Sequence, residues 1–170
     1  TYDGFTVSGA VNNLRIVPEG SGPVIIDTTT QGVVIDLLPI LNTVELNGMV
    51  IGDGTTANTS VTVTNSIGTV ILDDLEVHGG VGQPGIDVSA SIAVAIQRSV
   101  IDGVPGLRAG NNSNVIASKG SLDDLEVLTG STVNTCELPT SPTVDPGATL
   151  NLLAGLMPDI DAPLLQPLGG

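Results

Sequence analysis

The 170-residue sequence has very few aromatic and basic residues. Tyr2 and Phe5 are its only aromatic residues, and it contains no tryptophan. Four basic residues stand against eighteen acidic ones, which gives a formal net charge of −14 at pH 7. A chain this acidic is repelled by phosphate backbones and anionic lipid, so we expect neither nucleic-acid binding nor membrane insertion.

Cysteine and histidine each occur once. Cys136 therefore cannot form an internal disulfide, and His78 cannot build a histidine-rich metal centre. Apolar runs are interrupted long before the roughly 20 residues that a spanning helix needs. The chain begins Thr-Tyr-Asp-Gly rather than with Met, which fits either a trimmed chain or removal of a signal peptide. We expect the second, and hence an extracellular or cell-surface location.

The residues that are plentiful are β-branched and alternate with polar ones. Examples are residues 61–64, 86–88 and 94–96, which are bounded by Gly, Asn, Asp or Pro. This period of two predicts short strands, and no capped amphipathic helix of ten or more residues is indicated before position 148. The fold class expected is all-β.

The predicted strands recur in three series with steps near 25 residues. The first series starts at Phe5, Val33, Val61, Ile86, Leu107 and Val133, and the second at Leu14, Val44, Val70, Val94, Val115 and Val144. The third has a constant step of 25 and starts at Ile25, Val50, Val100 and, between and after these, Leu75, Leu125 and Leu150. The pentapeptide of residues 73–77 also recurs unchanged at 123–127.

Three strand series in constant order predict a three-sided parallel β-helix of about six turns. One turn cannot bury its apolar face alone, but turns stacked about 4.8 Å apart form a continuous aliphatic interior. Glycines between the runs, among them Gly48 and Gly80, are expected at the corners. The predicted organisation is a β-helix over residues 1–152 and a Pro- and Leu-rich arm or cap over residues 153–170.

Residues 70–80 and 94–107 resemble the repeats of the right-handed parallel β-helix superfamily typified by pectin lyase. Each segment has the order strand, short turn, strand and glycine loop that is typical of that superfamily. The resemblance covers about residues 5–135 and implies the fold. It implies no single activity, because polysaccharide lyases, tailspikes, adhesins and other surface proteins share this structural repeat.

The C-terminal segment has a different composition. Six of the eleven prolines follow Glu137, together with many leucines. Residues 144–152 are expected to add a last irregular turn. The following segment is expected to pack apolar side chains either on the open end of its own helix or on a neighbouring subunit: Leu156, Met157, Ile160, Leu164, Leu165 and Leu168.

The clearest charged pattern consists of two acidic pairs with Arg98 between them. Asp73 and Asp74 lie two predicted turns before Asp123 and Asp124. We interpret this as a charge ladder in which Arg98 screens both pairs. The resemblance also implies an alternative, because lyases of the superfamily hold Ca²⁺ on clustered aspartates and use an Arg or Lys as base. The four aspartates are thus weak candidates for a structural Ca²⁺ site, and no other cofactor is expected.

Three hypotheses for function remain open. The leading one is a non-enzymatic extracellular structural protein that self-associates, because both ends of a β-helix expose unpaired strands. The runner-up is a carbohydrate-binding or carbohydrate-active module. The third is a fragment of a larger adhesin or surface protein.

Overall fold

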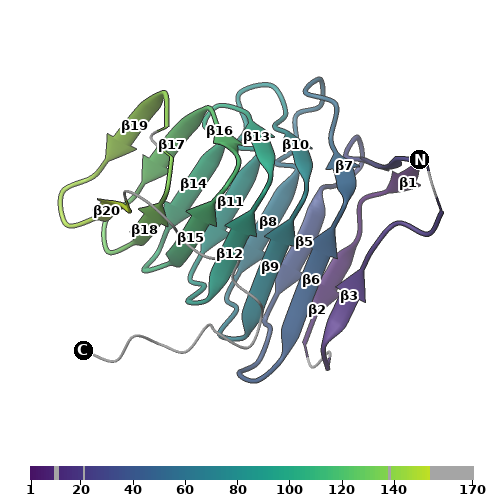
Figure 1. The fold of residues 1–170 in the computed structure, drawn as a ribbon, viewed down its shortest axis with the longest axis horizontal. Helices are drawn as coiled ribbons and strands as arrows, with labels where there is room; N and C mark the ends of the chain where they lie inside the picture. The colour runs from purple at the N-terminus through teal and green to yellow at the C-terminus, as the bar shows by residue number, and fades with distance from the viewer. Residues whose placement is uncertain (10–11, 21, 138, 154–170) are drawn as a thin grey trace.

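The structure is a computed structural model that describes residues 1–9, 12–20, 22–137 and 139–153. The described chain folds into 20 short strands that form three parallel sheets, here named sheets A, B and C. The sheets form the three sides of a coil (Figure 1). The predicted all-β, three-sided parallel β-helix is therefore confirmed. No helix in the described residues is long and apolar enough to cross a membrane.

Each sheet takes one strand from successive turns of the coil. Sheet A contains β1 (Tyr2–Asp3), β4 (Val24–Asp27), β7 (Met49–Ile51), β10 (Glu76–His78), β13 (Val100–Asp102) and β16 (Ser121–Leu122). Sheet B contains β2 (Thr6–Ser8), β5 (Val33–Asp36), β8 (Val61–Thr64), β11 (Ile86–Ser89), β14 (Leu107–Gly110), β17 (Asp124–Val127) and β19 (Ser141–Val144). Sheet C contains β3 (Leu14–Ile16), β6 (Thr43–Asn47), β9 (Thr69–Asp73), β12 (Val94–Gln97), β15 (Asn114–Ser118), β18 (Thr132–Thr135) and β20 (Thr149–Leu152).

The coil has six complete turns and part of a seventh. Each complete turn supplies strands to sheets A, B and C in that order, whereas the last described turn supplies β19 and β20. Sheet A therefore ends one strand earlier than the other two sheets. As a result, the C-terminal end of the coil is stepped.

The interior is a stack of aliphatic side chains in register from turn to turn. In sheet C, for example, Leu46 pairs with Leu72, and Leu72 pairs with Ile96. All three side chains are buried in one continuous cluster of Val, Ile, Leu and Met residues. Alternate residues of each strand point inward, so the period of two in the sequence is the period of burial.

The predicted strand series hold through the first five turns in sheets B and C and fail near the C-terminus. Val133 belongs to sheet C rather than sheet B, and Val144 belongs to β19 of sheet B. The third series is displaced earlier, because Val50 pairs with Glu76 and not with Leu75. Leu125 and Leu150 lie in sheets B and C, so their assignment to the third series is wrong.

The cause is a shortening of the turns. Arg108 and Glu126 face each other across one turn of only 18 residues, and Asn134 and Asn151 across one of 17. A constant step of 25 therefore shifts residues after position 107 onto the wrong side of the coil.

The turn from sheet C to sheet A, here called the C–A corner, repeats one backbone conformation. Gly48, Asp74, Arg98 and Lys119 occupy it in four successive turns, with φ of 70°, 51°, 47° and 50°. Only the first is glycine, although a positive φ favours glycine in isolation. Backbone bonds between turns hold the position: the Asp74 N–H donates to the Gln97 carbonyl, and the Arg98 N–H to the Ser118 carbonyl.

Buried serines satisfy the backbone at the corner between sheets B and C. The Ser66 N–H donates to the Ser91 hydroxyl oxygen, and the Ser113 N–H donates to the Ser131 hydroxyl oxygen. All four residues are buried. The serines thus replace strand-to-strand bonds where the chain changes direction, as buried backbone groups require.

Candidate functional site

The C–A corner carries the first charged cluster. Arg98 follows β12 and forms an ion pair with Asp73, the last residue of β9 in the preceding turn. Asn47 Nδ2, from the turn before that, donates to Asp73 Oδ2 at 2.8 Å. Strand stacking brings these three side chains together, since Asn47 and Asp73 are register partners in sheet C.

The structure does not assemble the full charge ladder expected from Asp73, Asp74, Arg98, Asp123 and Asp124. Asp74 lies one turn from Arg98 at the same corner, as predicted. Asp123 follows β16 of sheet A, and Asp124 begins β17 of sheet B. Arg98 therefore screens one acidic pair and not two. The prediction failed because the turn containing the second pair is shorter than 25 residues.

Asp73 is the most strongly perturbed carboxylate of this cluster. Burial raises its pKa above the ordinary value, while the positive charge of Arg98 opposes that increase. Its Oδ1 atom is buried and accepts no hydrogen bond. The guanidinium already contacts the other oxygen, so a cation at Asp73 would have to compete with Arg98.

A second cluster, which sequence reasoning missed, lies on the outer face of sheet A. His78 ends β10, and its Nδ1 lies 2.8 Å from Asp102 Oδ2 on the neighbouring strand β13. Its Nε2 lies 3.1 Å from Glu76 Oε1, two residues earlier on β10. Burial lowers the pKa of His78, but the hydrogen bonds and charges of Asp102 and Glu76 outweigh it, so the pKa is raised overall. The signal in the sequence was the spacing of 24 residues between His78 and Asp102.

Carboxylates occupy the same outer position on other strands of sheet A. Asp3 pairs with Asp27 at the N-terminal end, and the Asp123 N–H bonds to the Ile101 carbonyl beside Asp102. Among the described residues, however, no group of three or more His, Cys, Asp or Glu side chains has a geometry that could hold a metal ion. Nothing in this geometry supports Ca²⁺ on Asp73, Asp74, Asp123 or Asp124.

Sheet B carries a third cluster on three adjacent strands. Asp87, Arg108 and Glu126 share one outer row of β11, β14 and β17. Arg108 Nε donates to Glu126 Oε2 at 2.6 Å. Burial raises the pKa of Asp87, the positive charge of Arg108 opposes this, and Glu126 adds to it. The three residues lie two short turns apart, so a constant step of 25 could not have aligned them.

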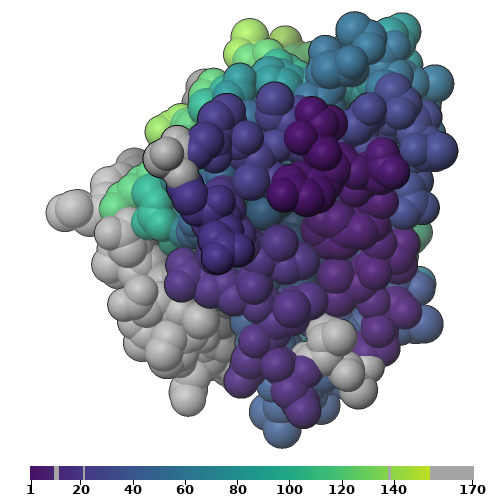
Figure 2. Space-filling model, turned by 90° about the vertical axis from the view of Figure 1, so that its right-hand side faces the viewer, coloured from purple at the N-terminus to yellow at the C-terminus, as the bar shows by residue number. Residues whose placement is uncertain are grey.

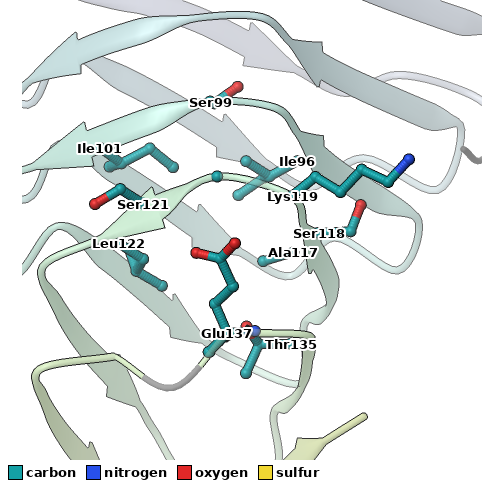
Figure 3. Close-up of a pocket in the computed structure, with 11 residues that line it drawn as sticks. Ile96, Ser99, Ile101, Ala117, Ser118, Lys119, Ser121, Leu122, Thr135 and Glu137 are labelled. Carbon is teal, nitrogen blue, oxygen red and sulfur yellow. Dashed lines mark hydrogen bonds between the residues drawn. The ribbon is translucent and has the colours of Figure 1, made fainter. Parts of the chain in front are cut away.

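One hollow lies near the step at the C-terminal end. Glu137 points into it between Leu122 and Ala117, whereas Lys119 extends away (Figure 3). Its volume is about 20 Å³, close to the roughly 10–15 Å³ that one water occupies and far below the roughly 300–1,000 Å³ of a ligand pocket. This hollow has room for a water molecule and not for a sugar ring.

The N-terminal end of the coil presents its first turn directly to solvent. Figure 2 shows this end, with the purple residues of the first turn forming the surface. The Val34 N–H donates to the Phe5 carbonyl, and the Gly9 N–H donates to the Asp36 carbonyl. Alternate residues of a parallel strand bond to opposite neighbours, so the backbone groups of Thr6 and Ser8 point to the free edge of β2.

The C-terminal end has a complementary free edge on sheet B. The Asp145 N–H donates to the Val127 carbonyl, so residues 143 and 145 face β17. The backbone groups of Pro142 and Val144 then point away from the sheet. Proline has no N–H, and here the missing donor falls on the free side, where an edge strand tolerates it.

The six apolar residues predicted for the interface lie outside the described residues: Leu156, Met157, Ile160, Leu164, Leu165 and Leu168. Comparisons with known proteins add no assignment. No protein-family model matches the chain, no curated protein matches it, and no solved structure matches it.

Proposed function

We propose that the protein is a non-enzymatic structural protein of the cell surface or extracellular space that self-associates head to tail. The observation that carries this proposal is the pair of free strand edges at opposite ends of one continuous coil. Unpaired parallel edges are templates for further strands. A head-to-tail contact between different surfaces repeats without closing and produces a filament.

The register of the buried rows specifies how two copies would stack. The inner row of sheet B runs through Val33 and Leu107 and ends at Pro142 of β19. Adding the next copy in register places its Phe5 over Pro142 and its Thr6 over Thr143. The Thr6 N–H of that copy would then donate to the Pro142 carbonyl, and the Val144 N–H would donate to the Thr6 carbonyl.

The charged clusters support a structural role for the sides of the coil. Arg98 is paired with Asp73, Arg108 with Glu126, and Arg15 with Glu45. These three of the four basic residues neutralise carboxylates of neighbouring turns, and they reduce the repulsion that a net charge of −14 brings to a stack. Exposed pairs of this kind contribute only about 0–1 kcal/mol each.

The substitution Thr6→Pro tests the proposal, with Thr6→Ala as the matched control. Proline removes the N–H that is free within one copy, while alanine keeps it. We expect Thr6→Pro to weaken association by roughly 2- to 12-fold or more, because a net hydrogen bond is worth about 0.5–1.5 kcal/mol. Thr6→Ala should associate like the original protein.

Sedimentation velocity over a concentration series measures the effect, and circular dichroism checks that both variants keep the β spectrum. A concentration-independent monomer of the original chain would overturn the proposal. Equal association of the two variants would overturn the role of the β2 edge.

A carbohydrate-binding role is the second candidate, favoured by Asp87, Arg108 and Glu126 on the outer face of sheet B. Carboxylates beside a guanidinium can accept and donate hydrogen bonds to sugar hydroxyls. We also propose that the fold is related to the right-handed superfamily typified by pectin lyase, in which such modules occur. Binding on a glycan array that Arg108→Ala abolishes would support this role, and an array without any binding would contradict it.

A further inference from the structure

The outer face of sheet C has an apolar centre between polar ends. Its central outer row contains, strand by strand, Arg15, Glu45, Ile71, Ala95, Ile116, Asn134 and Asn151. Arg15 pairs with Glu45 at one end, and Asn151 donates to Asn134 at the other. Ile71, Ala95 and Ile116, here called the sheet C patch, lie on the adjacent strands β9, β12 and β15 (Figure 1).

The sheet C patch is far less exposed than its position predicts. Ile71 is 5% exposed and Ala95 is 0% exposed, although neither belongs to the interior cluster. On sheet A, the outward-facing side chains of Val100 and Ile25 are 51% and 40% exposed. In the described part of the chain, no strand lies outside sheet C. The burial of Ile71 and Ala95 therefore requires a cover that the described strands do not provide.

The chain leaves the last described strand at the border of this patch. β20 belongs to sheet C, and the Leu153 N–H bonds to the Thr135 carbonyl. Continuing the register places Leu153 in the row of Ser118, Gln97 and Asp73, which are buried beside the patch. From β20 to β9 is four strands, about 19 Å at 4.8 Å each. The 17 remaining residues can span about 56 Å when extended.

The chemistry of the remaining segment is complementary to that of the patch. Residues 154–170 carry six large apolar side chains, together with Asp159 and Asp161 and no basic residue. Arg98 and Lys119 lie at the C–A corner, beside the rows that border the patch. Prolines at 158, 163 and 167 favour an extended strap over a helix.

We propose that the sheet C patch is the docking surface for residues 154–170 of the same chain. The segment closes the side of its own coil, and it is neither a plug for the open end nor a clamp on a neighbour. This leaves the strand edges at both ends free for stacking. The inference does not rest on the proposed function, because it concerns a different surface.

Thiol labelling tests the docking in the full chain. In a Cys136→Ser background, Ile71→Cys reports on the patch, and Val100→Cys is the matched control on the open face of sheet A. We expect the cysteine at position 71 to react with a maleimide at least tenfold more slowly than the one at position 100. Replacing Leu164 and Leu165 with Asp should bring the two rates together, while circular dichroism shows the β spectrum unchanged.

Three outcomes would overturn the proposal. Equal labelling rates in the full chain would show that the patch is open. Slow labelling that survives both Leu164→Asp and Leu165→Asp, and also removal of residues 154–170, would show that another cover is responsible. Protection that disappears on dilution would assign the cover to a second copy, whereas protection that is independent of protein concentration supports docking within one chain.

Discussion

Replacing Leu72 with alanine tests how the interior of the coil is held together. Leu72 is 0% exposed in the middle of sheet C, between its register partners Leu46 and Ile96. The strand that carries it is bonded to a strand on each side, so the backbone cannot close around a cavity. We therefore expect a loss of about 3–5 kcal/mol, the upper part of the range for a buried leucine.

The matched control is Val100→Ala, which shortens an outward-facing side chain that is 51% exposed. Its expected cost is below about 1 kcal/mol, as for most surface substitutions. Urea unfolding followed by circular dichroism measures both. Because turns contact only their neighbours, Leu72→Ala is also expected to broaden the transition by uncoupling the two halves of the stack. Equal costs at the two positions would refute the inward and outward assignment.

The remaining predictions concern charge and edge chemistry. His78→Gln should reduce the unfolding free energy at pH 5.5 more than at pH 8.5, because a raised pKa gives stability that is present below the unfolded pKa of about 6.5 and lost as pH rises through the folded pKa; an equal reduction at both pH values in urea titrations would contradict this. Asp73→Asn removes a buried charge whose pKa is raised, so stability should depend less on pH between 4 and 7 and should change by less than about 1 kcal/mol at pH 7; a loss above about 3 kcal/mol in the same assay would show that the pair with Arg98 is essential. Pro142→Thr adds a donor to the free edge of β19 and should strengthen association roughly 2- to 12-fold in sedimentation velocity, whereas weaker association would contradict the stacking register.

The architecture was predictable because it depends on local alternation. Val61–Thr64 and Ile86–Ser89 alternate in burial as their sequences alternate in polarity. Such alternation fixes which side chains face inward, and repetition of the alternating runs in a constant order indicates a coil. Both signals are contained in short stretches of sequence.

The position of a strand within the coil was not predictable near the C-terminus. Residues 73–77 and 123–127 have identical sequences, and in both copies the leucine and the valine are buried. The first copy nevertheless contributes β10 to sheet A, and the second contributes β17 to sheet B. The side of the coil is set by the length of the preceding turns, which local pattern does not encode.

The charged clusters were harder to predict for the same reason. Asp73 and Arg98 are one ordinary turn of 25 residues apart, and sequence spacing paired them correctly. Arg108 and Glu126 are joined across a turn of 18 residues, so their pairing follows only from the register in sheet B. Corner glycines were predicted from their permissive φ, but Asp74, Arg98 and Lys119 adopt the same conformation because bonds between turns impose it.

Negative-stain electron microscopy of the full chain over a concentration series tests head-to-tail stacking most directly. Sheets B and C have seven strands each, so one copy should add about 34 Å to the axis at 4.8 Å per strand. The account predicts unbranched filaments one coil wide, with an axial repeat near that value, that shorten or disappear with Thr6→Pro and persist with Thr6→Ala. Isolated particles of single-chain size at every concentration, or filaments that both variants form equally, would contradict it.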